Sequence, residues 1–105
     1  RAGAWAPSTI NTVVVVDATP EPAAMVNAVI TATEVKTALL AEAGVKCGAG
    51  LFASGTSTDA VAVAATGNGR ACRFGGPVSE LGSVVARAVR EAMGRGIARW
   101  LEDNA

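Results

Sequence analysis

The loop just before the apolar run at residues 61–65 carries the side chains best suited to chemistry. It reads Gly55, Thr56, Ser57, Thr58, Asp59 and Ala60. The hydroxyls and the carboxylate bring several short donors and acceptors to one point in space, and the glycine allows a tight bend. The same composition is typical of a turn in which Ser and Thr side chains bond their own backbone. From these residues alone, both interpretations stay open.

A second polar group interrupts an otherwise apolar segment and consists of Thr33, Glu34 and Lys36. On a helix, Glu34 shares one ridge with Thr31 and Asn27. Such a ridge is either a solvated surface or one wall of a site. From these residues alone, both interpretations stay open.

Lys36 differs from its neighbours because it falls within the apolar stripe of the predicted helix. An ammonium in that position must reach solvent along its stem or meet a carboxylate. An anion contact, a catalytic role and a structural ion pair are all open. Asp59 and Asp17 are the two candidate partners.

Asn11 opens a β-branched run at residues 10–16 that contains four consecutive valines. A valine run without alternation is typical of a strand covered on both faces, so we expect an inner strand. A polar amide that enters a buried strand needs hydrogen-bond partners. Asn11 therefore either ties loops together or holds a substrate amide or oxyanion.

The elements that must position these residues follow the order β-α-β-β-α. Apolar periodicity and turn residues predict strands at 10–16, 59–66 and 71–74, helices at 20–43 and 79–101, and a hairpin-type turn at 67–69. We predict an α/β (or α+β) fold in which helices pack on a mixed sheet. No internal repeat or domain boundary is visible in the 105 residues.

Capping residues define both predicted helices. Thr19 caps the first helix with Pro20 at its first position, and Gly44 ends it in the left-handed region. Ser79 caps the second helix. Its predicted apolar stripe is Leu81, Val84, Val85, Ala88, Val89, Ala92 and Met93, and its predicted solvated face is Arg87, Arg90, Arg95 and Arg99.

Composition narrows the classes of function. Nine basic and nine acidic residues cancel, which argues against nucleic acid or an anionic membrane as a partner. No uninterrupted apolar run approaches the roughly 18 residues of a membrane span. The absence of histidine excludes a Ser-His-Asp triad within this chain and argues against zinc, so we expect no metal and no resident cofactor. Two cysteines, Cys47 and Cys72, favour a reduced cytoplasmic protein.

Taken together, the motifs resemble the adenosylcobinamide amidohydrolase family. The segments that carry the resemblance are Thr9-Ile10-Asn11-Thr12 with the valine run and Asp17, residues 27–38, residues 55–60, and Phe74-Gly75-Gly76-Pro77 with Leu81-Gly82 and an amphipathic helix. They occur in order and cover nearly all of the chain. The chain is similar to the second half of the family domain, so the alternatives are a single domain over residues 1–105 or the C-terminal half of a larger one.

The resemblance implies an enzyme of corrinoid salvage for coenzyme B12 synthesis. Family members hydrolyse the amide between the corrinoid side chain and aminopropanol in adenosylcobinamide, and the product is adenosylcobyric acid. The resemblance implies that the catalytic positions are Glu34, Lys36 and Asp59. The substrate-binding positions that it implies are Asn11, Thr33, Thr56 and Thr58. Three positions depart from the family pattern: Ser57 and Ser8 replace an expected glycine, and Val35 replaces an expected alanine. We count Ser57 as substrate-binding, although its side chain narrows a close approach to ligand.

The resemblance also bears on partners. The first half of the family domain carries further motifs of the site, and we expect activity to need it. The chain is then either a fragment that pairs with that N-terminal half or a remnant that forms a homo-oligomer over an open sheet edge. The expected small-molecule partner is the corrinoid substrate.

Amide hydrolysis needs an activated nucleophile, an oxyanion site and a proton for the leaving amine. Without histidine, we expect Glu34 or Asp59 to activate water or a threonine hydroxyl, and Lys36 to stabilise the oxyanion or tune the carboxylate. The expected positioning groups are Thr56, Thr58 and Asn11. Two other classes stay open: a non-catalytic binding or assembly module that grips a small ligand through backbone amides, and a structural fragment whose polar motifs only tie loops together.

Overall fold

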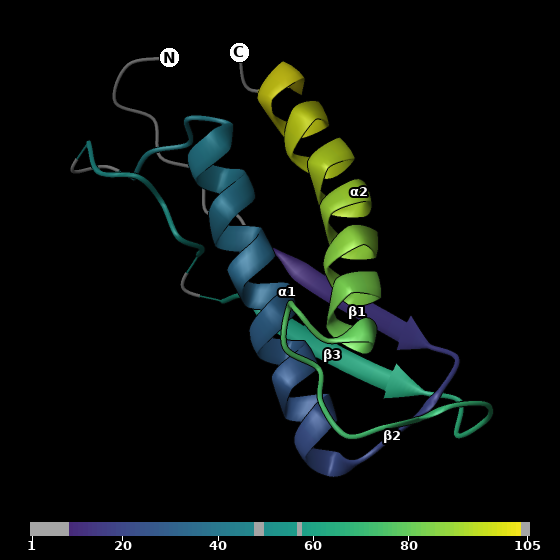
Figure 1. The fold of residues 1–105 in the computed structure, drawn as a ribbon. Coiled ribbons are helices and arrows are strands. Elements are labelled where there is room, and N and C mark those ends of the chain that lie inside the picture. The colour runs from purple at the N-terminus through teal and green to yellow at the C-terminus, as the bar shows by residue number, and fades with distance from the viewer. Residues whose placement is uncertain (1–8, 48–49, 57, 104–105) are drawn as a thin grey trace.

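Two long helices pack side by side on one face of a short parallel sheet (Figure 1). The computed structural model describes residues 9–47, 50–56 and 58–103. Its elements are β1 (Asn11–Val16), β2 (Thr19–Pro20), α1 (Pro22–Glu42), β3 (Ala60–Ala65), β4 (Ala71–Cys72) and α2 (Glu80–Asp103). The predicted α/β class is confirmed.

The strands pair in parallel. β1 pairs with β3 from Asn11–Ala60 to Val16–Ala65, so α1 is the crossover helix of a β-α-β unit. β4 pairs with β2, not with β3. The predicted hairpin at 67–69 is therefore wrong, and the last strand is shorter than predicted. The turn instead carries the chain across the end of the sheet, where the Gly67 amide donates to the Ala18 carbonyl.

The valines of β1 alternate between two faces. Val14 and Val16 are buried beneath the helices, whereas Val13 is 73% exposed and Val15 is 69% exposed. The expectation of an inner strand covered on both faces is wrong for the described residues, because both helices lie on the same side of the sheet (Figure 1) and β1 pairs with β3 alone. The core consists of Val14, Val16, Ala24, Ala28, Ala32, Leu81, Val85 and Val89.

Helix α1 starts two residues later than predicted. Thr19 and Pro20 belong to β2, and the N-cap is Glu21, which makes no side-chain cap. At the other end the prediction is confirmed, since Gly44 has a φ of 73°. Thr31, predicted on a polar ridge, is buried instead, and its hydroxyl donates to the Gly75 carbonyl at 2.7 Å.

By length and composition alone, α1 is long and apolar enough to cross a membrane. The argument from uninterrupted apolar runs therefore does not exclude such a span. A core helix of a soluble protein passes the same test, and here α1 packs against α2 and β3. The packing favours the core-helix interpretation.

Helix α2 begins as the sequence predicts. The Ser79 hydroxyl oxygen accepts from the Gly82 amide at 2.9 Å and caps the helix. The four predicted surface arginines are exposed, but so are Val84, Ala88 and Ala92 from the predicted stripe. Gly82 packs so closely that an added Cβ would overlap the Gly76 carbonyl.

Candidate active site at the amino ends of the strands

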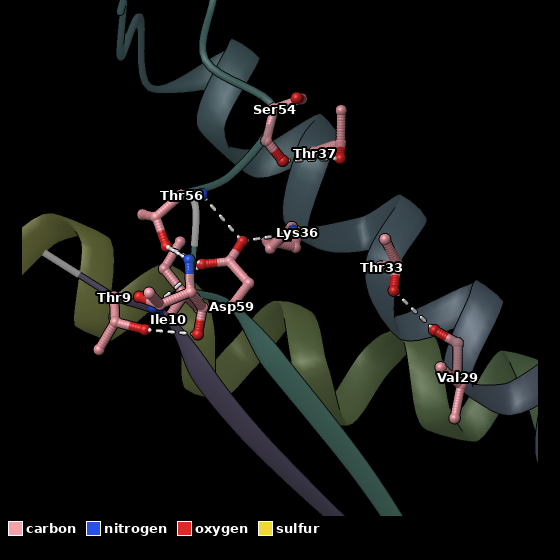
Figure 2. A network of polar contacts seen from close by, with 10 residues as sticks. Thr9, Ile10, Val29, Thr33, Lys36, Thr37, Ser54, Thr56 and Asp59 are labelled. Atoms are coloured by element: carbon pink, nitrogen blue, oxygen red, sulfur yellow. Dashed lines mark hydrogen bonds and ion pairs between the residues drawn. The ribbon is translucent and has the colours of Figure 1, made fainter.

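The most buried ion pair among the described residues joins α1 to the residue before β3. Lys36 Nζ donates to Asp59 Oδ2 at 2.6 Å, and the two side chains are only 9% and 12% exposed (Figure 2). Of the outcomes left open for a lysine in the apolar stripe, the structure shows an ion pair with a carboxylate. The partner is Asp59 and not Asp17, whose carboxylate accepts from the Thr66 hydroxyl at 2.7 Å.

Asp59 accepts three further hydrogen bonds. Its Oδ2 also accepts from the Thr56 amide at 3.0 Å, and its Oδ1 accepts from the Ile10 amide at 3.1 Å and from the Thr56 hydroxyl. The donors come from α1, from the loop before β3 and from the residue before β1. One carboxylate therefore ties three segments together at the amino ends of both paired strands (Figure 2).

The charge on Asp59 follows from these partners. Burial raises the pKa of the Asp59 carboxyl, but the hydrogen bonds from Lys36, Thr56 and Ile10 outweigh it and lower that pKa from 3.8 to about 2. Asp59 is therefore ionised at neutral pH and fully paired with donors.

The loop before β3 is held at several further points. The Thr58 amide donates to the Thr56 hydroxyl oxygen at 3.3 Å, and the Thr58 carbonyl accepts from Thr9 Oγ1 at 3.0 Å. Thr37 Oγ1, on α1, donates to the Ser54 carbonyl at 3.1 Å. The turn-like interpretation is thus confirmed for Thr56, whose hydroxyl bonds its own loop. Ser57, a predicted substrate contact, lies outside the described residues.

Gly55 has a different role from the one its sequence position suggests. Its φ is not among the positive values of the described glycines, so the loop does not need glycine's extra conformational freedom. It needs the missing side chain. An added Cβ would overlap Asp59 Oδ2 and lie 2.7 Å from Lys36 Nζ.

Glu34 and Thr33 do not join this cluster. Lys36 follows Glu34 by two residues, which is about 200° around a helix, and Glu34 is exposed while Lys36 is buried. The Thr33 hydroxyl donates to the Val29 carbonyl of its own helix at 2.9 Å, away from Asp59 (Figure 2). The structure therefore separates the glutamate from the lysine that the sequence pattern groups with it.

Asn11 lies on the far face of the sheet. It is exposed and shares a face of β1 with Val13 and Val15, which point away from the helices. The expectation that Asn11 enters a buried strand and needs internal partners is wrong for this structure.

Two hollows occur elsewhere on the described part of the chain. One lies between the C-terminal ends of the helices and is lined by Leu39, Glu42, Ala43, Gly94, Ile97, Ala98 and Leu101. The other lies beside the start of α2 and is lined by residues 70–74 and 79–81. Neither includes Lys36 or Asp59. Within the described residues, no group of three or more Cys, Asp or Glu side chains is placed to hold a metal ion.

Sequence reasoning missed several members of the network. The Ile10 amide and the Ser54 carbonyl are backbone groups, which leave no trace in residue type. Thr9 and Thr37 donate side-chain hydroxyls, and both lie inside the motifs that resembled a family. Their hydroxyl groups were the one available signal.

Comparison with known protein families identifies the family of the chain. The model of the CbiZ family, described as adenosylcobinamide amidohydrolase, matches residues 1–105, which is the whole chain. No curated protein matches, and no solved structure does. The family match covers every element that builds the Asp59 network. The chain therefore belongs to the adenosylcobinamide amidohydrolase family.

Proposed function

We propose that the protein hydrolyses the amide bond between the corrinoid side chain and aminopropanol in adenosylcobinamide. Water adds its oxygen to the amide carbon, the carbon–nitrogen bond breaks, and the amine leaves with a proton. The products are adenosylcobyric acid and aminopropanol. The single observation that carries this proposal is the family match over the whole chain.

Among the described residues, the polar groups that could contact substrate lie on two sides of α1. On one side, Asp59 and Lys36 hold the loop that ends in Thr58, an exposed residue. On the other side, Glu34 makes no hydrogen bond or ion pair with another described residue. Glu34 therefore has both oxygens free to accept a proton from water. We propose Glu34 as a candidate base and the loop as a candidate contact for another part of the corrinoid, because a base must lie within hydrogen-bond reach of the amide on which it acts.

The test is turnover by the protein in its natural length, with residues 1–105 alone assayed in parallel. Purified protein is mixed with adenosylcobinamide, and free aminopropanol and adenosylcobyric acid are measured by mass spectrometry. The proposal requires both products in equal amounts. Substrate that stays intact in the presence of folded natural-length protein would refute it.

The role of Glu34 is tested in the same assay. Glu34→Gln should lower kcat by roughly 100-fold or more, since general base catalysis contributes about 10²–10⁴-fold. Glu102→Gln, a change of another exposed helical glutamate, is the matched control and should leave kcat unchanged. Equal kcat values for the two variants would remove Glu34 from the mechanism.

Two observations favour a second candidate, a non-catalytic binding or assembly module. The Asp59 network lies at the amino ends of the parallel strands, whereas ligands of open α/β sheets bind at the carboxyl ends. The polar groups around Asp59 also bond one another and not an open cavity. In the turnover assay, saturable binding of adenosylcobinamide without any aminopropanol release would select this candidate.

We propose a cytoplasmic location and a covering partner for the exposed sheet face. Both cysteines are free thiols, as a reducing compartment allows. The exposure of Val13 and Val15 supports a partner surface, either a second copy or the remainder of a larger domain. Light scattering measures the molar mass of residues 1–105 in solution. A dimer supports a second copy as the partner, and a monomer supports the remainder of a larger domain.

A further inference from the structure

The Asp59 carboxylate has no acceptor site left for a reacting proton. A carboxylate offers about four lone-pair sites. Here Oδ2 accepts from Lys36 and from the Thr56 amide, and Oδ1 accepts from the Thr56 hydroxyl and the Ile10 amide. A water molecule that is to lose a proton to Asp59 must first break one of these bonds. The arrangement suits a group that holds structure in place, not one that exchanges protons.

Gly55 leaves the space that the Asp59 carboxylate and the Lys36 ammonium occupy. An added Cβ would overlap Asp59 Oδ2, lie 2.7 Å from Lys36 Nζ and lie 3.3 Å from Lys36 Cε. Both atoms are the ends of side chains and can shift, but they form one ion pair, so making room for a Cβ displaces that pair. Because real Cβ atoms do not approach neighbours this closely, any side chain at position 55 must push the carboxylate or the ammonium away.

The Asp59 network and its neighbours hold the backbone of Thr58 within the loop. Both backbone groups of Thr58 are engaged, its amide with the Thr56 hydroxyl and its carbonyl with Thr9. Thr58 itself is exposed, and its own hydroxyl makes no hydrogen bond with another described residue. The loop thus presents the free Thr58 hydroxyl from a backbone that is held at both its amide and its carbonyl.

We propose that Gly55 and Asp59 are positioning residues for the proposed hydrolysis. Together they close the loop onto α1 and onto the start of β1, and they hold the Thr58 hydroxyl where it contacts the substrate. Asp59 acts through the loop and takes no proton from water. This inference rests on the proposed function for its catalytic part, whereas the closure of the loop can be tested without any substrate.

The first experiment measures the closure directly. Amide hydrogen exchange is followed by NMR at Thr56 and Ile10, whose N–H groups both donate to Asp59. Gly55→Ala should speed exchange at both amides by roughly tenfold or more, because it displaces their charged acceptor. Gly76→Ala is the matched control: Gly76 also lies in a loop, its φ is not positive, and an added Cβ meets nothing within 4 Å.

The second experiment measures turnover in the natural-length protein. Gly55→Ala and Asp59→Ala should each lower kcat on the order of 100-fold, the effect of a displacement of about 1 Å in a positioning group, with smaller changes in KM. The double variant should be no worse than either single variant, because both changes remove the same closure. Thr56→Val, a milder change that keeps the backbone donor, should give an intermediate loss.

Each outcome decides the proposal. Unchanged exchange at Thr56 and Ile10 in Gly55→Ala would overturn the closure, and a kcat equal to that of Gly76→Ala would overturn the positioning role. Additive losses in the double variant would show that Asp59 acts independently, as a proton-transferring residue does. A wild-type protein without turnover would refute the proposed function and with it the positioning role, while the exchange data would still decide the closure.

Discussion

The buried ion pair provides the sharpest test of the structure. Lys36→Met removes the ammonium while keeping an unbranched side chain of similar length. The change leaves the Asp59 carboxylate, 12% exposed, without its charged partner. A nearly buried carboxylate that loses its counter-charge keeps its desolvation penalty but not the attraction that offset it.

The magnitude follows from what remains around Asp59. Breaking a buried pair by removing one partner destabilises a protein by about 3–5 kcal/mol. Here three donors from Thr56 and Ile10 still bond the carboxylate. We therefore expect Lys36→Met to lower the free energy of unfolding by about 2–4 kcal/mol at neutral pH.

The assay is urea unfolding at neutral pH, with Arg95→Met as the matched control. The Arg95–Glu91 pair has a similar N–O distance of 2.9 Å, but its side chains are 79% and 66% exposed, so its loss should cost no more than about 1 kcal/mol. In an Asp59→Asn background, Lys36→Met should lower the free energy of unfolding by less, because no buried carboxylate is then left without a counter-charge. If Lys36→Met costs no more than Arg95→Met, the buried ion pair does not exist as described.

Three further outcomes are expected. The pKa of Asp59 is lowered from 3.8 to about 2, so its ionised form stabilises the fold above that ordinary value. The wild-type advantage over Asp59→Asn should therefore fall by about 2 kcal/mol as the pH drops through that window, and a flat difference would contradict this. Gly82→Ala should lower the melting temperature far more than Gly94→Ala, because an added Cβ would overlap the Gly76 carbonyl at Gly82 and would meet nothing within 4 Å at Gly94; equal melting temperatures would refute the close packing. Thr31→Val should lower the free energy of unfolding, measured in urea, by about 1–3 kcal/mol, since it removes the buried hydrogen bond to the Gly75 carbonyl; an unchanged free energy would contradict that bond.

Local patterns in the sequence predicted what local physics decides. Lys36 was anomalous in an apolar stripe, and a carboxylate partner followed from the penalty of burying an unpaired ammonium. Ser79 and Gly44 defined helix ends because capping depends on one side chain or one backbone angle. The α/β class followed in the same way from runs of apolar residues.

Non-local features were out of reach of the sequence. The valine run looks the same whether one face or both faces are covered, so the exposure of Val13 and of Asn11 depends on where the helices pack. The parallel pairing of β4 with β2 likewise joins segments about fifty residues apart. Helix geometry alone predicts that Glu34 and Lys36 point in nearly opposite directions. The two residues were nevertheless grouped because they belong to one motif.

The requirement at Gly55 shows why residue type alone misleads. Glycine in a loop suggests a special backbone angle, yet the structure uses its lack of a side chain to admit the Asp59 carboxylate. Steric contacts of this kind connect Lys36 of α1 to Gly55, which lies 19 residues further along the chain. They become visible only when the helix, the loop and the strand are placed together.

The most direct test of the central claim is hydrolysis of adenosylcobinamide in ¹⁸O-labelled water. If the protein breaks the amide with water, the adenosylcobyric acid released by the natural-length protein carries one ¹⁸O atom, and aminopropanol appears in equal amount. Substrate that binds but stays whole would contradict the account, as would acid formed without the label.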